Sequence, residues 1–233
     1  MRAILILTGL DLEARALARR LDLPRLTSIG AGGFGRGLVR VAPVGLRAGC
    51  LEARWASLVS GLGRPVVVSA GLCGALDPNL AAGDLVLPER VIGPTGAEAC
   101  SATDVHRRAV ARVPSARIGP IVTTLDVVAT PEAKAELRAR TGAVAADMES
   151  SVILRAAAAA ELPSLVVRGV SDDARQALPP ELIDMMSPEG RLRIGRAGAL
   201  LAHPAMLPRA LSLHWATAGA LRAVAGVLAG LAA

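Results

Sequence analysis

The sequence predicts a layered α/β fold, in which helices flank a central sheet that is mostly parallel or mixed. Short aliphatic runs alternate with helical segments along the chain, with no repeats or low-complexity linkers. The 233 residues suit one large domain, residues 1–233, better than two small ones, and they can bury a core without disulfides or metals. Hydrophobic residues make up 52% of the chain but aromatics only 1%, so Ala, Val and Leu must fill that core.

The elements follow one another in a regular order. Pro131 stands just before a helical segment, in the first turn, where a proline is tolerated. We expect strands at residues 3–8, 38–44, 65–70, 85–92, 118–123, 144–147 and 164–170, and helices at 12–21, 49–62, 105–112, 132–140, 150–161 and over most of the tail.

Three glycine-bearing segments join these elements. Residues 30–37 contain the letters of a dinucleotide fingerprint but lead into a strand, so we favour a hairpin or flexible loop. Residues 44–47 could place backbone amides and the Arg47 guanidinium around an anion, although a solvated surface arginine is nearly as well supported. In the third loop, residues 70–78, glycines such as Gly71 would let a ligand approach the backbone.

Acidic residues stand where two expected strands end. Asp147 and Glu149 follow one apolar run, and Asp172 follows another. Ligands of open α/β sheets bind beyond the carboxyl ends of the strands, where loops and strand-terminal side chains meet. The sequence therefore predicts a ligand site that contains these carboxylates.

Charge and cysteine content exclude several classes of function. Basic residues exceed acidic ones by six, but only Lys134 is a lysine, which indicates a general preference for arginine, and no aromatic-plus-basic surface is available for nucleic acid. The three cysteines are isolated, which favours a reducing cytoplasm. The three histidines lack partners at metal-ligand spacing, so we expect no metal.

The tail at residues 190–233 is basic and apolar, and no acidic residue follows Glu189. We favour a closing helix packed on the sheet over an interfacial helix lying on a membrane, and no apolar run is long enough to span one. The stripe that predicts this helix consists of Leu211, Trp215, Ala218, Leu221, Ala225 and Leu228, with Arg209 and Arg222 at its margins.

Four segments in order carry a family resemblance: residues 8–13, residues 69–76 with 83–86 downstream, residues 147–149 and residues 168–172. Together they resemble the purine nucleoside phosphorylase and methylthioadenosine nucleosidase superfamily over nearly the whole chain. The Asp-Met-Glu-Ser form and the basic tail look most like the hopanoid-associated phosphorylases, which are bacterial proteins tied to removal of adenine from adenosylhopane. The resemblance implies a three-layer nucleoside-phosphorylase-like fold and a homodimer or larger assembly.

The resemblance also implies phosphorolytic release of adenine from a 5′-substituted adenosine, with phosphate as co-substrate and no cofactor. Asp172 would protonate N7 of adenine, and Ser171 would orient the carboxyl group or the base. Glu149 would accept hydrogen bonds from the ribose hydroxyls, and Met148 would lie against the ribose. Glu13 would activate water in a nucleosidase, or contact phosphate or the sugar in a phosphorylase. The other expected contacts are Gly71, Leu72, Val127 and Val128 for the nucleoside, and Gly9, Gly45 and Arg47 for phosphate.

The chain also departs from the methylthioadenosine nucleosidase pattern. Leu72 replaces a serine on the purine side, Asp147 replaces a longer glutamate, and residues 122–130 and 88–106 lack aromatics. An open 5′ end suits a larger group, such as a lipid that leaves along an apolar groove toward the C-terminal helices. These helices could collect the lipid from the membrane surface, with the protein peripheral on the inner face of the membrane. The alternatives are a hydrolytic methylthioadenosine/adenosylhomocysteine nucleosidase and a non-catalytic nucleoside-binding protein.

Overall fold

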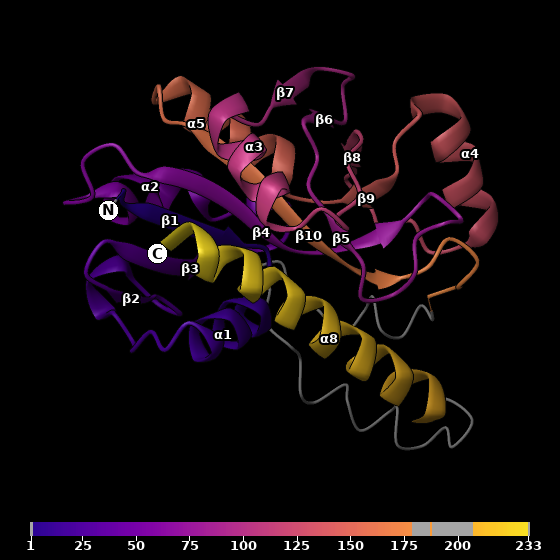
Figure 1. The fold of residues 1–233 in the computed structure, drawn as a ribbon, viewed down its shortest axis with the longest axis horizontal. Coiled ribbons are helices and arrows are strands. Elements are labelled where there is room, and N and C mark those ends of the chain that lie inside the picture. The colour runs from indigo at the N-terminus through magenta and orange to yellow at the C-terminus, as the bar shows by residue number, and fades with distance from the viewer. Residues whose placement is uncertain (1, 179–186, 188–206, 233) are drawn as a thin grey trace.

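The computed structural model describes residues 2–178, 187 and 207–232, and it confirms the predicted α/β class (Figure 1). Within these residues, ten strands form one sheet in the order β2-β3-β1-β4-β9-β8-β6-β7, and β10 pairs with both β4 and β5. The strands are β1 (Ile4–Thr8), β2 (Phe34–Arg36), β3 (Val39–Pro43), β4 (Val66–Ala75), β5 (Leu85–Val86), β6 (Arg90–Ile92), β7 (Glu98–Cys100), β8 (Ile121–Thr123), β9 (Ala145–Asp147) and β10 (Ser164–Asp172).

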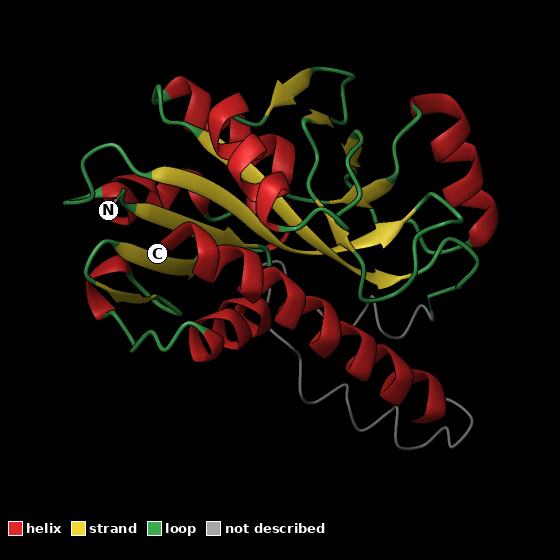
Figure 2. Cartoon of the chain, in the orientation of Figure 1, coloured by secondary structure: helices red, strands yellow, loops and turns green. Residues whose placement is uncertain are grey.

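Helices cover both faces of this sheet (Figure 2). Side chains alternate along a strand, so Ile4 and Ile6 of β1 face one layer of helices while Leu5 and Leu7 face the other. Both faces are buried, which explains why the central strands are continuous apolar runs. The helices are α1 (Asp11–Arg20), α2 (Leu51–Val59), α3 (Thr103–Arg112), α4 (Pro131–Thr141), α5 (Ser150–Ala159) and α8 (Leu207–Ala232), with 3₁₀ turns η1 (Thr27–Ile29) and η2 (Leu46–Ala48).

The structure corrects two of the expected elements and confirms a third. The predicted loop at 70–78 was wrong in its first half, because β4 continues as strand through Ala75 and pairs with β10 and β9 there. The expected strand at 85–92 is two short strands, β5 and β6, separated at Pro88, which has no N–H for a ladder. Residues 34–36 form the strand β2 of a hairpin with β3, so the hairpin interpretation of 30–37 is confirmed.

The long helix α8 crosses the face of the sheet beside α1 (Figure 1). Leu221, Ala225 and Leu228 of the predicted stripe are buried in the core while Arg222 is exposed, so packing on the sheet is confirmed for residues 216–231. The side chains at 211 and 215 and the segment 188–206 lie outside the described residues. None of the helices described is both long and apolar enough to cross a membrane.

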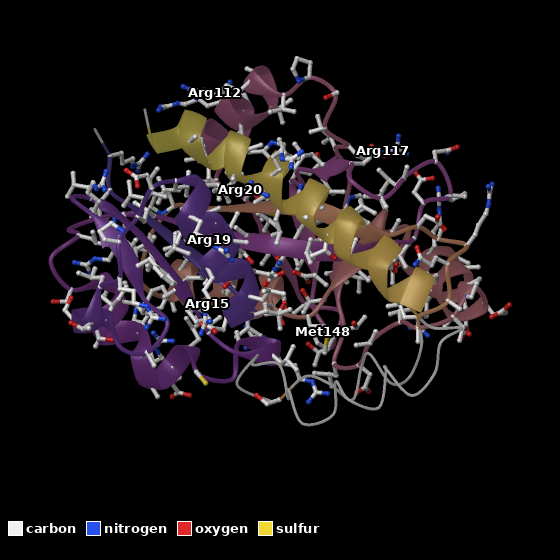
Figure 3. The ribbon with its side chains drawn as sticks, turned by 90° about the horizontal axis from the view of Figure 1, so that it is seen from below. Arg15, Arg19, Arg20, Arg112, Arg117 and Met148 are labelled. Carbon is white, nitrogen blue, oxygen red and sulfur yellow. The ribbon has the colours of Figure 1, made fainter. Side chains whose placement is uncertain are left out.

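Arginines of α1 border this helix, and Arg15, Arg19 and Arg20 are labelled in Figure 3. Arg20 donates a hydrogen bond to the Ala218 carbonyl of α8 at 3.4 Å. Where α8 crosses β10, a side chain at Gly169 would meet Ala220 at 2.8 Å, so a glycine is needed for the close approach of helix and strand.

Candidate active site

A cavity of about 180 Å³ lies beyond the ends of β1, β8 and β9 and beside the second halves of β4 and β10. The predicted site residues that line it are Glu13, Leu72, Val127, Val128, Met148, Glu149, Ser171 and Asp172; other lining residues include Leu10, Leu46, Cys73, Gly74, Leu76, Thr124, Lys134, Ala146, Asp147 and Leu178. Met148 follows β9 and is labelled in Figure 3. Four predicted contacts, Gly9, Gly45, Arg47 and Gly71, are absent from this lining.

Glu13 enters the cavity from the first turn of α1. Its carboxylate accepts hydrogen bonds from the backbone N–H of Leu72 at 2.8 Å and of Leu10 at 3.0 Å, and the residue is 4% exposed. Burial raises the pKa of Glu13 above its usual value, although the nearby Arg168 opposes the shift. Glu13 is therefore a buried carboxyl group that can hold a proton.

Glu149 stands just before α5 and is also buried. Its Oε1 accepts a hydrogen bond from the backbone N–H of Arg47 at 3.1 Å, and its Oε2 lies 3.9 Å from the Arg168 guanidinium. Burial raises the pKa of Glu149 to about 8; Arg168 opposes this, whereas Asp147 and Glu13 add to it. A carboxylate so placed can accept from a hydroxyl when ionised and donate to one when protonated.

Arg168, from the middle of β10, organises the carboxylates. Its side chain is 1% exposed and its Nη2 lies 2.6 Å from Asp147 Oδ2. The same nitrogen donates to the hydroxyls of Ser69 at 2.9 Å and Ser150 at 3.1 Å. Burial alone would lower the pKa of Arg168, but the surrounding carboxylates raise that pKa above its usual value, so the guanidinium stays protonated. The sequence motif at 168–172 contains this arginine, but sequence reasoning gave it no role.

Asp147 connects three elements around the cavity. It accepts hydrogen bonds from Thr123 Oγ1 at 2.7 Å and from the backbone N–H of Ser150 at 3.0 Å, besides its pair with Arg168. These three contacts occupy the carboxylate, so its short side chain joins β8, α5 and β10. Its part in the site is to fix the geometry around Glu149.

Two of the predicted glycines lie against carboxylates. A side chain at Gly71 would meet Arg168 Nη1 and Glu13 Oε1, each at 2.6 Å, and one at Gly9 would meet the carboxyl carbon of Glu149 at 2.7 Å. Any larger residue would displace the charged cluster. Phosphate binding by Gly9 stays a prediction.

Asp172 ends β10 beside Ser171. A register shift between Val170 and Asp172 is a β-bulge, and it explains how two consecutive side chains of one strand can both line the cavity. The Ser171 hydroxyl is 2.5 Å from Asp172 Oδ1 and 3.1 Å from the Cys73 carbonyl. The sequence-predicted pair is thus brought together.

Lys134 binds the other oxygen of Asp172. Its Nζ donates to Asp172 Oδ2 at 2.6 Å, and also to the carbonyls of Asp173 at 2.7 Å and Gln176 at 2.9 Å. The lysine side chain is 1% exposed. Sequence reasoning treated it as a matter of composition; a single lysine among 26 basic residues was the available signal.

Arg47 does not line the cavity. It lies in η2 with a left-handed φ of 56°, which aims its backbone N–H at Glu149. Its guanidinium donates to the Leu125 carbonyl and, at 3.1 Å, to Asp126, and its side chain is 54% exposed. Phosphate binding by Gly45 and Arg47 stays a prediction. In the described part of the chain, no group of three or more His, Cys, Asp or Glu side chains could hold a metal ion.

Comparisons with known proteins agree with this architecture. The model of the family described as "Phosphorylase superfamily" matches residues 3–201. A search of curated proteins found no match. Similar solved structures include an MTA/SAH nucleosidase from Streptococcus pneumoniae in complex with 8-aminoadenine (TM-score 0.74, 18% identity, covering 100% of this chain and 99% of that one).

Two further structures share the fold. One is a 5′-methylthioadenosine/S-adenosylhomocysteine nucleosidase from Neisseria meningitidis in complex with methylthio-immucillin-A (TM-score 0.73, 17% identity, covering 100% of this chain and 99% of that one). The other is futalosine hydrolase from Helicobacter pylori (TM-score 0.72, 15% identity, covering 99% of this chain and 97% of that one). At these identities the likeness establishes the fold.

Proposed function

Because the chain belongs to the phosphorylase superfamily, we propose that it cleaves the N-glycosidic bond of a 5′-substituted adenosine and releases adenine. One observation carries the proposal: two separate acidic groups share one largely apolar cavity. Asp172 lies 3.1 Å from the side-chain position of Gly74, and Glu13 lies 2.6 Å from that of Gly71. Both carboxylates line this cavity of about 180 Å³, so both can contact one bound ligand.

Asp172 and Glu149 suit the two ends of the scissile bond. Adenine leaves readily only when it is protonated, and Asp172 beside Ser171 can pass a proton to N7, which is worth roughly 10²- to 10⁴-fold in rate. Glu149 would hold the ribose hydroxyls, and in its ionised form its negative charge would stabilise the sugar as it becomes an oxocarbenium-like cation. Met148, Val127 and Val128 would supply the apolar surface around the ribose and the base.

We propose phosphate as the nucleophile, bound by Arg47 and the amides of Gly45 and Gly9 after the Arg47 guanidinium leaves Asp126. Hydrolysis is the second candidate, and a specific observation favours it. Glu13 and Glu149 are buried near the sugar end, and the buried Arg168 is already bound to Asp147. In this alternative, Glu13 would activate a water molecule in place of phosphate.

For the 5′ group we propose a bulky substituent, with adenosylhopane and hopanoid biosynthesis as the specific case. A second hollow of about 770 Å³ shares Thr124, Val127 and Val128 with the cavity and extends between α4 and the strands β6 to β8. A large group could leave by this route. The path that we expected, toward the C-terminal helices, depends partly on residues 179–206, most of which lie outside the described residues. A cytoplasmic homo-oligomer with peripheral membrane contact completes the proposal.

The test is adenine release by purified protein in detergent from a 5′-alkylated or hopanoid-linked adenosine and from methylthioadenosine, each with and without phosphate. Phosphate-dependent release from the bulky substrate supports the full proposal. Phosphate-independent release that favours methylthioadenosine identifies the hydrolytic alternative. No release from any substrate, with adenosine analogues still bound, identifies a binding protein.

The variant Asp172→Asn separates catalysis from binding. We expect a loss of kcat of roughly 10²-fold or more with nucleoside binding retained. Since an asparagine at this position would leave the Lys134 ammonium without its carboxylate, the double variant Lys134→Met, Asp172→Asn serves as the fold control, and thermal unfolding is measured for both. Equal turnover by wild type and a folded Asp172→Asn would remove Asp172 from the mechanism.

A further inference from the structure

The buried ion pair between Lys134 and Asp172 is more than a structural contact. An ammonium group has three N–H donors, and all three of Lys134 are used: one on the Asp172 carboxylate and two on the carbonyls of Asp173 and Gln176. Lys134 therefore fixes both the carboxylate and the segment that follows β10. The position of Lys134 on α4 follows from the start of that helix. Thr130 caps α4, and Pro131 occupies its first turn, one turn before Lys134.

The ion pair leaves open which group supplies the proton for general acid catalysis. A carboxylate that faces an ammonium at 2.6 Å is the ionised partner of an ion pair, yet general acid catalysis requires a proton to give. The Ser171 hydroxyl bonds the other carboxylate oxygen, but a serine hydroxyl is too weak an acid to supply the proton. Lys134 is the only cationic proton donor in contact with Asp172 among the described residues.

We propose that Lys134 is a positioning residue that also supplies, through Asp172, the proton delivered to the leaving base. The inference rests on the proposed function and adds to it the source of the proton. Lys134 Nζ passes a proton to Asp172 Oδ2, which turns the ion pair into a neutral amine and a carboxylic acid. The acid then protonates N7 as the C1′–N9 electron pair moves onto adenine, and Asp172 is again a carboxylate.

The cycle closes without an added reagent. The attacking water or phosphate gives up one proton when its oxygen bonds to C1′, and the neutral Lys134 amine takes up one proton before the next turnover. No oxidant or reductant takes part. Arginine could hold Asp172 but could not perform this cycle, because a guanidinium does not release its proton at accessible pH.

Other titratable groups near the pair must be kept constant in any test. Cys73 on β4 is buried, which raises the pKa of its thiol and keeps it neutral. The carboxylates and cations to be retained are Glu13 on α1, Asp147 and Glu149 at the end of β9, Arg168 on β10, and Asp173 and Arg175 in the segment after β10. Every Lys134 variant keeps these groups, so the variants differ from wild type only at position 134.

The experiment measures kcat against pH for wild type, Lys134→Met and Lys134→Arg, with Glu132→Gln, an exposed charge on the same helix, as the control. Lysines ordinarily titrate near pH 10.4 and aspartates near 3.9. We therefore expect the alkaline limb of the profile to move to lower pH by more than about one unit in Lys134→Met, where Asp172 must hold its own proton. Lys134→Arg should lose roughly 10²-fold in kcat despite its charge, and Glu132→Gln should match wild type.

A second readout follows the proton directly. Lys134 is the only lysine in the sequence. Protein labelled with [¹⁵N]lysine, and purified with a tag that contains no lysine, therefore gives one side-chain nitrogen signal. We expect its titration to coincide with the alkaline limb of kcat in wild type, and to move in Asp172→Asn. The proposal fails if Lys134→Arg keeps the kcat of wild type, or if Nζ keeps its proton through the pH range where kcat falls. Either result would mean that Lys134 only positions Asp172. If wild type releases no adenine, the proposed function itself fails, which the same assay reveals first.

Discussion

Replacement of Glu149 by glutamine tests the electrostatic character of the site through protein stability, without any substrate. Glu149 is 6% exposed, and burial raises its pKa to about 8, against 4.5 for an ordinary glutamate. Glutamine has nearly the same shape and can still accept the hydrogen bond from the Arg47 backbone. It cannot ionise, so the variant removes only the cost of placing a charge there.

The sign follows from counting protons. Between pH 4.5 and 8 the unfolded chain has lost the Glu149 proton while the folded protein retains it, so the free energy of unfolding falls by about 1.4 kcal/mol per pH unit. This contribution of Glu149 is complete below pH 4.5 and is lost as the pH rises through 8. The stability of Glu149→Gln relative to wild type should therefore increase by about 4 kcal/mol between about pH 5 and pH 8.

Urea unfolding followed by circular dichroism at several pH values across this range measures this difference. The matched control is Glu136→Gln on α4, because the Glu136 side chain is 78% exposed and its replacement should change stability little. A pH-independent difference between Glu149→Gln and wild type would refute the reasoning, since it would mean that Glu149 is ionised in the folded protein as readily as in the unfolded chain. Adenine release by Glu149→Gln should fall, because the sugar loses its carboxylate.

Three further substitutions test the packing around the site. Arg168→Met should destabilise the protein by about 3–5 kcal/mol, because it leaves Asp147 buried without its cation; a loss below about 1 kcal/mol in thermal unfolding would contradict this. Gly71→Ala should cost about 1–3 kcal/mol and lower kcat, since the new methyl group meets Glu13 and Arg168 at 2.6 Å; unchanged activity would show that the carboxylate moves freely. Gly226→Ala, at an exposed position of α8 with nothing within 4 Å, should raise stability by about 0.5–1 kcal/mol and leave activity as in wild type.

The parts of the fold that could be predicted from the sequence are those with continuous apolar signals. The runs at 3–8 and 164–170 read as buried strands because both faces of the sheet are covered. The three-residue strands β2 and β7 have too few residues for a period-2 pattern to appear. β7 was not expected, and β2 was expected only within the hairpin or flexible loop at 30–37. The second half of β4 was misassigned because Gly71 and Gly74 resemble loop residues, whereas tertiary contacts with Glu13 and Asp172 require glycine within the strand.

The sequence located some residues of the candidate site and missed others. Asp172 and Glu149 could be located because strand ends and motif letters are local features of the sequence. The pair of Lys134 with Asp172 joins α4 to β10 across 38 residues, and no local pattern records such a contact. Arg47 was placed on the right loop, but whether its guanidinium or its backbone N–H faces the site depends on a left-handed backbone conformation that sequence reasoning did not identify.

The distribution of charge connects the geometry to the reaction. Asp172 pairs with Lys134, whereas three carboxylates, Glu13, Asp147 and Glu149, share Arg168. In the free protein that excess is unfavourable, and it adds to the effect of burial in raising the pKa values of Glu13 and Glu149. Under the proposed function, a sugar that gains positive charge in the transition state would relieve this repulsion. The same carboxylates, once ionised, would then bind the transition state more tightly than the neutral substrate, and that difference would lower the barrier.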